Sequence, residues 1–326
     1  MMTQRLKPDD AGVSCAAALL RAGALVAFPT ETVYGLGANA ADPGAVARIY
    51  AAKGRPADNP LIVHVASPGA IDEWAVPDVR ARELARRFWP GPLTLVLPGR
   101  GLFGAPTLAL RMPAQPVALA LLAAVGRPIA APSANRSGRP SPTSAQAAYQ
   151  EMQGRIEAVL EGPTARVGIE STVLDLSLAE AALLRPGGIS AAQIADALGE
   201  HIGEAKGSAR SPGTRYRHYA PEVEITLFAD DERQRLIESV ARALSACRGS
   251  WYIGLAETAP KGAKGLLAND VRQLQQELYA ALLEAERQGA PVVAVLPPQS
   301  SSAAGVRDRM LRAAGGKVQA AQGREE

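Results

Sequence analysis

The sequence predicts an α/β protein with two domains, and three observations support this class. Short apolar segments of strand character alternate with longer segments of helical periodicity. The 326 residues exceed the usual size of a single domain. Between His201 and Arg217 the composition changes to Gly, Ser, Lys and Arg, which is typical of an interdomain linker. We therefore place the domain boundary in this part of the chain.

Seven short segments of the first domain have strand character, because each is apolar or alternating and is bounded by turn residues. They are Leu25–Phe28, Leu61–Val65, Leu93–Leu97, Leu108–Pro113, Ile129–Ala131, Gly168–Leu176 and Ala182–Gly188. Several connections between them are too short for a helical crossover. We therefore expect parallel and antiparallel pairs mixed in one sheet.

The helices between these strands have recognisable ends. Asp9 or Asp10, Asp42 and Ser190 are candidate N-caps, and Gly54 and Gly126 are typical C-terminal stops. The predicted helices are Asp10–Gly23, Asp42–Gly54, Asp78–Phe88, Val117–Gly126, one that begins near Thr143, and Ser190–Leu198. Together these elements define a first domain of residues 1–203.

The second predicted domain, residues 223–326, is a smaller Rossmann-like α/β unit. Its strands are Val223–Phe228, Ser250–Leu255 and Pro291–Leu296, and its helices are Glu232–Cys247, Asp270–Arg287 and Ser302–Ala313. Strands separated by helices favour a parallel sheet. Since this half lacks a Gly-rich phosphate loop and clustered acids, we expect it to have a supporting role. We interpret residues 204–222, between the two domains, as a linker or a lid.

The composition indicates a soluble chain with aliphatic cores, because hydrophobic residues make up 47% and aromatic residues only 4%. A net charge of +3 permits an anionic substrate or RNA but requires neither. The N-terminal residues are polar, and no apolar run approaches the ~18 residues of a membrane span. We expect a cytosolic protein with no membrane anchor.

The two cysteines, Cys15 and Cys247, lie far apart in the sequence. Because Cys15 falls in an apolar helical pattern, we expect buried, reduced thiols and no disulfide framework. The three histidines do not combine with them into the spacing of a metal site, so no protein-bound metal is predicted.

Cationic side chains recur on loops at the ends of predicted strands. They are Lys53, Arg55, Arg111, Arg136, Arg139 and Arg185. Hydroxyl and amide side chains accompany them: Thr30, Thr32, Ser133, Asn135, Ser141, Ser171 and Thr172. Guanidinium groups pair bidentately with phosphates and carboxylates, and lysine acts on phosphate as a point charge. Taken alone, Lys53 and Arg55 could also be two solvated cations after a helix.

The sequence contains no Walker loop and no G-x-G-x-x-G after a strand, so side chains would help the backbone to hold a nucleotide. No serine has an identifiable base, and no G-x-S-x-G elbow is present. The pattern therefore favours phosphoryl or nucleotidyl transfer, in which positioning and charge carry most of the catalysis. Mg²⁺ would then arrive with the triphosphate and need few protein carboxylates.

Seven motifs occur in order along the chain. They are PTETVYGLG (Pro29–Gly37), KGRPADNPLIVHV (Lys53–Val65), RMP (Arg111–Pro113), PSANRSGRPSPT (Pro132–Thr143), GIESTV (Gly168–Val173), LRPG (Leu184–Gly187) and SPGTRYRHYAP (Ser211–Pro221). Together they resemble the threonylcarbamoyl-AMP synthases in their long, two-domain form. The resemblance implies a YrdC-like twisted mixed sheet with helices, followed by the smaller C-terminal domain. One departure is Thr214, where the family pattern has methionine.

The resemblance implies a reaction in which L-threonine, bicarbonate or CO₂, and ATP give threonylcarbamoyl-AMP and pyrophosphate. The threonine amine would capture CO₂ as a carbamate, whose oxygen attacks the α-phosphorus, so no enzyme nucleophile is required. The product would serve the threonylcarbamoyladenosine modification at position 37 of tRNA, through a downstream tRNA-modifying transferase complex. The resemblance also allows weak tRNA binding.

Roles follow for the positions that match the family motifs. Four residues resemble a catalytic tetrad on the nucleotide's phosphates: Lys53, Arg55, Ser133 and Asn135. ATP contacts fall on Arg55, Asn59, Thr107, Ser133, Ser141, Arg185 and the linker residue Tyr219. Threonine contacts fall on Thr32, His64, Arg111, Ala131 and Ser171. Arg111 is the natural partner for the threonine carboxylate.

Other interpretations stay open. YrdC-like domains also occur in carbamoyl-transfer proteins that make carbamoyl-adenylate from carbamoyl phosphate, but those carry acylphosphatase, zinc-finger or kinase-like domains that are not recognisable in this sequence. A non-catalytic RNA-binding module would need basic stripes or stacking aromatics, which a net charge of +3 and four phenylalanines do not favour. His64, on a strand, could also be a structural core histidine.

Overall fold

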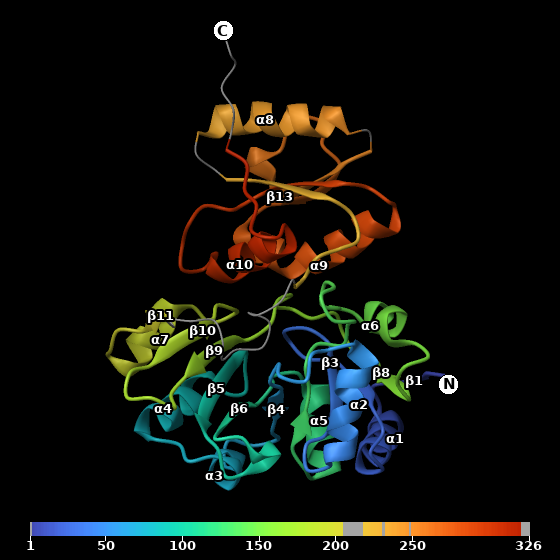
Figure 1. The fold of residues 1–326 in the computed structure, drawn as a ribbon, viewed down its shortest axis with the longest axis vertical. Coiled ribbons are helices and arrows are strands. Elements are labelled where there is room, and N and C mark those ends of the chain that lie inside the picture. The colour runs from blue at the N-terminus through green and yellow to red at the C-terminus, as the bar shows by residue number, and fades with distance from the viewer. Residues whose placement is uncertain (1, 205–217, 230–231, 248, 321–326) are drawn as a thin grey trace. The chain divides into compact units, whose positions relative to one another are not determined.

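The computed structural model describes residues 2–204, 218–229, 232–247 and 249–320 (Figure 1). The chain divides into two compact units. The first contains the described residues up to 204 except 138–140, and the second contains 138–140 and the described residues from 218 onward. Most of the predicted linker, residues 205–217, lies outside the described residues.

The first unit is built on a mixed sheet with the strand order β1-β8-β2-β3-β7-β4-β6-β5-β9-β10-β11. Pairs such as β4 with β6 and β5 with β9 are parallel, whereas β5 with β6 and β9 with β10 are antiparallel. The predicted mixed pairing is therefore confirmed. The strands are β1 (Gln4–Leu6), β2 (Val26–Phe28), β3 (Gly35–Asn39), β4 (Ile62–His64), β5 (Leu93–Pro98), β6 (Thr107–Arg111), β7 (Ile129–Ala130), β8 (Ala158–Leu160), β9 (Thr172–Asp175), β10 (Ala182–Arg185) and β11 (Gly203–Glu204).

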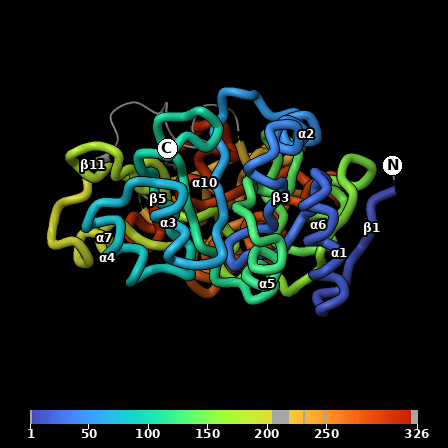
Figure 2. The backbone as a smooth tube through the Cα atoms, turned by 90° about the horizontal axis from the view of Figure 1, so that it is seen from below, coloured from blue at the N-terminus to red at the C-terminus, as the bar shows by residue number. Residues whose placement is uncertain are grey.

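Seven described helices accompany this sheet. They are α1 (Asp10–Arg21), α2 (Pro43–Lys53), α3 (Ala70–Trp74), α4 (Val79–Phe88), α5 (Pro116–Val125), α6 (Ala145–Met152) and α7 (Ala191–Leu198). Helices α1 and α5 lie side by side at the end of the unit that carries β1 and β8, whereas α4 and α7 lie at the end that carries β10 and β11 (Figures 1 and 2).

Several predicted helix ends are confirmed. The Asp42 carboxylate accepts hydrogen bonds from the N–H groups of Gly44 and Ala45 at the start of α2. Gly54 ends the same helix in the left-handed conformation, at φ 62°. This stop turns the chain directly after Lys53 and fixes where the cationic loop begins.

Strand alternation divides the central strands into two faces. Leu95, Leu110 and Leu174 are fully buried on the face that packs against α2 and α4, and each contributes about 1.5–3 kcal/mol by burial. Their neighbours Val96 and Ala109 pair with each other and belong to a separate small cluster. The helices therefore cover one face, and the alternate residues of the same strands are presented on the other.

Strand β3 begins at Gly35, inside the motif Pro29–Gly37, which the sequence did not predict to contain a strand. A side chain at Gly37 would meet both the Phe28 ring and the Ile129 side chain at 3.0 Å. Glycine at this position therefore lets β3 fit between β2 and β7 without displacing these two side chains. The hydroxyl-rich part of the motif forms the loop between β2 and β3.

The second unit contains a parallel sheet in the order β12-β15-β13-β14, which confirms the expected pairing type. Its strands are β12 (Ile225–Phe228), β13 (Trp251–Leu255), β14 (Gly265–Ala268) and β15 (Val292–Val295), and its helices are α8 (Arg233–Ala246), α9 (Val271–Arg287) and α10 (Ala304–Ala313). The sequence did not predict β14, whose four residues alternate between exposed and buried positions. No described helix of the chain is long and apolar enough to cross a membrane.

The expectation of buried cysteines is wrong, because Cys15 and Cys247 are both exposed and free. The buried row of α1 consists of Gly12, Ala16 and Leu20 at four-residue spacing, and the buried Ala17 lies beside it. Cys15 lies one position away from this row. It is therefore turned about 100° away from the buried side of the helix.

Candidate active site

Five adjacent strands bring distant polar residues together on the sheet. His64 of β4 lies opposite Arg111 of β6 in the parallel register. At the start of β9, the Ser171 hydroxyl lies 2.7 Å from the hydroxyl of Thr94 on β5. Arg185 of β10 donates from Nη2 to both the carbonyl and the hydroxyl of Ser171, at 3.0 and 3.2 Å. The strand order β4-β6-β5-β9-β10 therefore forms a row of cations and hydroxyls from residues far apart in the sequence.

Arg111 is held in place on two of its three nitrogen atoms. Nη2 donates to the Glu31 carboxylate at 2.7 Å, and Nε donates to the Gly91 carbonyl at 3.2 Å. The remaining nitrogen, Nη1, has no hydrogen bond to any residue that the structure describes. This nitrogen is available to an anionic ligand.

His64 is a buried, neutral imidazole. Burial, together with the positive charge of Arg111, lowers its pKa from 6.5 to about 3. Its Nδ1 atom is buried and has no hydrogen-bond partner in the described part of the chain. The Phe28 ring meets the imidazole edge-on, at 6.1 Å between the ring centres. A polar atom in this position is expected to have a ligand partner.

The hydroxyl loop between β2 and β3 packs against the loop that follows β7. Tyr34 donates its N–H to the Pro142 carbonyl at 2.8 Å and accepts from the N–H of Ala134 at 2.8 Å. Within the first loop, the Thr30 hydroxyl lies 2.8 Å from the hydroxyl of Thr32, which is fully buried. These backbone bonds bring Thr32 and the Ser133 loop to the same part of the unit.

Lys53, the last residue of α2, is buried. Its ammonium donates to the main-chain carbonyl of Ser133 at 2.6 Å and to that of Asn135. Burial and the nearby Arg55 charge lower its pKa well below the usual 10.5. An approaching polyphosphate would raise that pKa again and be attracted by both cations. Lys53 therefore braces the Ser133–Asn135 loop and adds positive charge to it.

The loop after α2 contains a buried amide with no hydrogen bond to a described residue. Asn59 is 1% exposed, and neither its Oδ1 nor its Nδ2 has a partner among the residues described. Arg55 donates from Nε to the Asn59 carbonyl at 3.2 Å and from Nη2 to the Pro60 carbonyl at 2.9 Å. The guanidinium therefore fixes the loop backbone around an amide that lacks a partner. Such an amide costs about 1–3 kcal/mol for each group, which points to a ligand.

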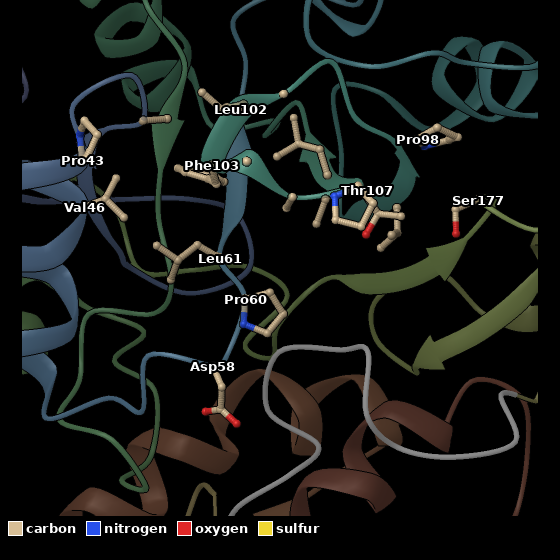
Figure 3. Close-up of a pocket in the computed structure, with 18 of the residues that line it drawn as sticks. Pro43, Val46, Asp58, Pro60, Leu61, Pro98, Leu102, Phe103, Thr107 and Ser177 are labelled. Atoms are coloured by element: carbon tan, nitrogen blue, oxygen red, sulfur yellow. The ribbon is translucent and has the colours of Figure 1, made fainter.

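A cavity of about 1400 Å³ opens beside the N-terminal end of β6 (Figure 3). Pro43, Leu61, Pro98 and Thr107 are among the residues that line it, and none of its lining residues is Lys or Arg. Thr107 and Arg111 lie on the same face of β6, four residues and about 13 Å apart. The strand therefore joins a cavity that no Lys or Arg lines at one end to a cation at the other.

Two further predicted residues, Ser141 and Ala131, also belong to the first unit. Ser141 is fully buried and donates to the Glu170 carboxylate at 2.5 Å, beside Ser171. Ala131 follows β7 and donates its N–H to the carbonyl of Ile62, two residues before His64. Of the sequence-predicted positions, the first unit contains Thr32, Lys53, Arg55, Asn59, His64, Thr107, Arg111, Ala131, Ser133, Asn135, Ser141, Ser171 and Arg185.

Tyr219 belongs to the second unit. It is buried there with a positive φ of 64°, which is uncommon for a residue other than glycine. Its ring lies 5.6 Å from that of Tyr279 and 5.3 Å from the guanidinium of Arg309. Aromatic and cation–π contacts from α9 and α10 therefore stabilise this backbone conformation.

Two buried carboxylates of the site, Glu31 and Glu170, were not predicted to act in it. Glu31 stands between two threonines in PTETVYGLG, and Glu170 directly precedes Ser171 in GIESTV. Their place inside these motifs is the signal by which the sequence could have indicated them. The ion pair itself could not be predicted locally, because Arg111 is 80 residues away from Glu31. No cluster of three or more His, Cys, Asp or Glu side chains that could hold a metal occurs in the described residues.

The fold and this site define an α/β protein that gathers cations, hydroxyls and a large cavity in its larger unit. A family model described as "Telomere recombination" (Sua5/YciO/YrdC) matches residues 18–187. A second, described as "Threonylcarbamoyl-AMP synthase, C-terminal domain", matches residues 189–315. The chain belongs to the two-domain threonylcarbamoyl-AMP synthase family, as its motifs predict.

Similar proteins agree over nearly the full length. The chain is 43% identical over 306 residues to a threonylcarbamoyl-AMP synthase from Pyrococcus abyssi, which covers 89% of each chain. It is 39% identical to the corresponding Bacillus subtilis protein, which covers 97% of each. A solved structure described as P. abyssi Sua5 complexed with L-threonine superposes with a TM-score of 0.89 at 39% identity, covering 99% of this chain and 100% of that one. The predicted fold class is confirmed.

Proposed function

We propose that this chain is an L-threonylcarbamoyladenylate synthase, a nucleotidyltransferase that converts L-threonine, bicarbonate or CO₂, and ATP into threonylcarbamoyl-AMP and pyrophosphate. The single observation that carries the proposal is the row from His64 through Arg111 and Ser171 to Arg185, in a chain of this family. The P. abyssi relative, described as complexed with L-threonine, supports the choice of amino acid.

Threonine would bind beside the buried end of β6. Arg111 has Nη1 left for the threonine carboxylate, and Nδ1 of His64 is left for a polar group of the same ligand. The hydroxyls of Thr32 and Ser171 and the main chain at Ala131 would complete this subsite. Because His64 is neutral at physiological pH, it would not repel the ammonium form of the amino acid.

ATP would bind with its phosphates near the end of α2. Lys53, Arg55, Ser133 and Asn135 would surround the phosphates, and the Asn59 amide, which bonds to no described residue, would gain a hydrogen-bond partner. Ser141 and Arg185 would contact the nucleotide from the other loops. The cavity that includes Thr107 is lined by no Lys or Arg, and its charged lining residues are Asp58 and Asp175, so it suits the part of the nucleotide that carries no phosphate.

Mg²⁺ would be bound through the triphosphate. The hard oxygen atoms of Ser141 and Glu170, which lie beside Ser171, are of the kind that this ion accepts, so the residues present fit it. When bound, the ion would neutralise charge on the phosphates. The protein's own cations would add to this effect during attack at the α-phosphorus.

The chemistry requires positioned reactants rather than a nucleophilic side chain. The threonine amine adds to CO₂ and loses a proton, giving a carbamate. A carbamate oxygen then bonds to the α-phosphorus as the bond to pyrophosphate breaks, which leaves the carboxylic-phosphoric anhydride of threonylcarbamoyl-AMP. The row of Arg111, Ser171 and Arg185 beside the Lys53 loop supports this step, because it would hold both anionic reactants at fixed positions.

The remaining parts of the proposal follow from family membership. We assign catalysis to residues 1–203, a closing role to the linker 204–222 with Tyr219, and support to residues 223–326. The product would pass, in the cytosol, to a transferase that modifies position 37 of tRNA, and weak tRNA binding by this chain belongs to the same proposal.

The experiment that tests the function is product identification by mass spectrometry. The protein is incubated with ATP, Mg²⁺, L-threonine and ¹³C-bicarbonate, and threonylcarbamoyl-AMP should carry one ¹³C atom. In a parallel reaction, carbamoyl phosphate replaces threonine and bicarbonate. Carbamoyl-adenylate formed only there would assign the chain to carbamoyl transfer instead. No adenylate in either reaction, together with a salt-sensitive shift of tRNA, would favour a non-catalytic RNA-binding module.

A further inference from the structure

Glu31 forms a buried ion pair with Arg111 that nothing local in the sequence requires. The side chains are 1% and 4% exposed, and Oε1 of Glu31 lies 2.7 Å from Nη2 of Arg111. The second oxygen, Oε2, accepts the N–H of Ala114 at 3.0 Å. Both carboxylate oxygens are therefore occupied, one by the cation and one by the backbone that follows β6.

This pair determines which part of the guanidinium remains for a ligand. Glu31 takes Nη2 and the Gly91 carbonyl takes Nε, so the planar group can neither rotate nor tilt without losing a bond. Only Nη1 is left without a hydrogen bond to a described residue. The Glu31 backbone is fixed as well, because its carbonyl accepts the N–H of Val167 at 2.8 Å.

We infer that Glu31 is a positioning residue for the amino-acid substrate: it orients the Arg111 guanidinium so that Nη1 meets the substrate α-carboxylate. This inference rests on the proposed function, because it deepens the threonine subsite. A buried guanidinium without its carboxylate would turn toward other acceptors. Glu31 would therefore act on threonine binding through Arg111, without contacting the nucleotide.

The Glu31→Gln variant isolates this role. Glutamine has the same shape, but its NH₂ group must face either Arg111 Nη2 or the Ala114 N–H, both of which are donors. One of the two bonds is therefore lost while the volume is kept. Glu31→Asp retains the charge at a shorter reach, and it serves as the second variant if the glutamine variant does not fold.

Calorimetric titration with L-threonine, L-threoninol and ATP is the test. We expect Glu31→Gln to raise the Kd for L-threonine by about 10- to 100-fold and to change the Kd for ATP by less than twofold. Because L-threoninol has no carboxylate, the preference for L-threonine over it should shrink by the same factor. Glu31→Asp should fall between the wild type and the glutamine variant. When Arg111 is already replaced by Met, Glu31→Gln should raise the Kd for L-threonine by less than a further twofold.

The matched control is Glu161→Gln, which makes the same change in the exposed pair of Arg5 and Glu161. It should leave both affinities unchanged. The inference would be overturned if Glu31→Gln lost threonine and ATP affinity equally, or if a folded variant kept an unchanged Kd for threonine. The proposed function would remain supported in either case, provided that the wild type binds L-threonine. If the wild type itself bound no L-threonine, the proposed function would fail as well.

Discussion

Lys53 Nζ donates a hydrogen bond of 2.6 Å to the main-chain carbonyl of Ser133. This contact joins the end of α2 to the loop after β7, which is 80 residues further along the chain. Because the ammonium is buried and also bonds the Asn135 carbonyl, one side chain fixes the loop and supplies positive charge to it. Position and charge in the proposed phosphate subsite therefore depend on the same residue.

Removing either cation of this loop should abolish turnover. Lys53→Met keeps the apolar stem but leaves two buried carbonyls without their donor, so we expect a loss of stability of about 1–3 kcal/mol as well. Arg55→Ala should leave the fold intact, since Arg55 is partly exposed. We expect a loss of at least 100-fold in pyrophosphate release for both, measured beside thermal unfolding. Near-normal turnover in both variants would disprove the phosphate-subsite assignment.

Asn59→Leu should stabilise the protein while weakening ATP binding. The wild-type amide is buried with neither end hydrogen-bonded to a described residue, so an apolar side chain of similar size removes an energetic cost. We expect the free energy of unfolding to rise by about 1–2 kcal/mol and the Kd for ATP to rise at least 10-fold. Denaturant titration and calorimetry measure the two quantities. If ATP bound the variant with unchanged affinity, Asn59 would have no role in the nucleotide site.

His64 should make the protein sensitive to acid. Its pKa is lowered to about 3 when folded, from 6.5, so the unfolded chain binds the proton more tightly. Above pH 6.5 the free energy of unfolding is therefore not reduced by His64. As the pH falls from 6.5 toward 3, the free energy of unfolding decreases, by at most about 1.4 kcal/mol per pH unit. His64→Gln should flatten this slope. Urea titrations of both proteins between pH 7 and 4 measure it, and parallel curves would contradict the account.

Gly187→Ala should disrupt the strand ends that carry Ser171 and Arg185. A Cβ atom there would lie 2.4 Å from the Thr172 nitrogen and 2.5 Å from the Glu170 carbonyl oxygen, both in the backbone. Because the backbone must shift, we expect a loss of about 1–3 kcal/mol in stability. The matched control is Gly69→Ala, where nothing lies within 4 Å of the added carbon. Equal melting temperatures for the two variants would refute this prediction.

Much of the fold could be predicted because its signals are local. Asp42 and Gly54 mark the ends of α2 by capping chemistry alone, and turn residues bound most strands. Cys15 was misplaced because alanine occupies both buried and exposed positions of α1, so residue type alone did not mark the buried side. The strand β14 was missed because two of its four residues are exposed and it begins at Gly265, which has a positive φ of 124°.

The site was predicted from motifs, but its partnerships were not. The pair of Glu31 and Arg111 joins segments 80 residues apart, and the Ser171 contact with Thr94 joins segments 77 apart. Only the strand order of the sheet brings them together, and that order is a property of the whole domain. A motif therefore indicates which residues take part, whereas the sheet determines which residues touch.

The most direct test of the central claim is pyrophosphate release from ATP and Mg²⁺, measured with L-threonine and bicarbonate omitted one at a time. The account predicts release only when both are present, because the attacking group is a carbamate formed from the two. Release that continues without threonine, or that is unaffected by removal of bicarbonate and CO₂, would contradict it.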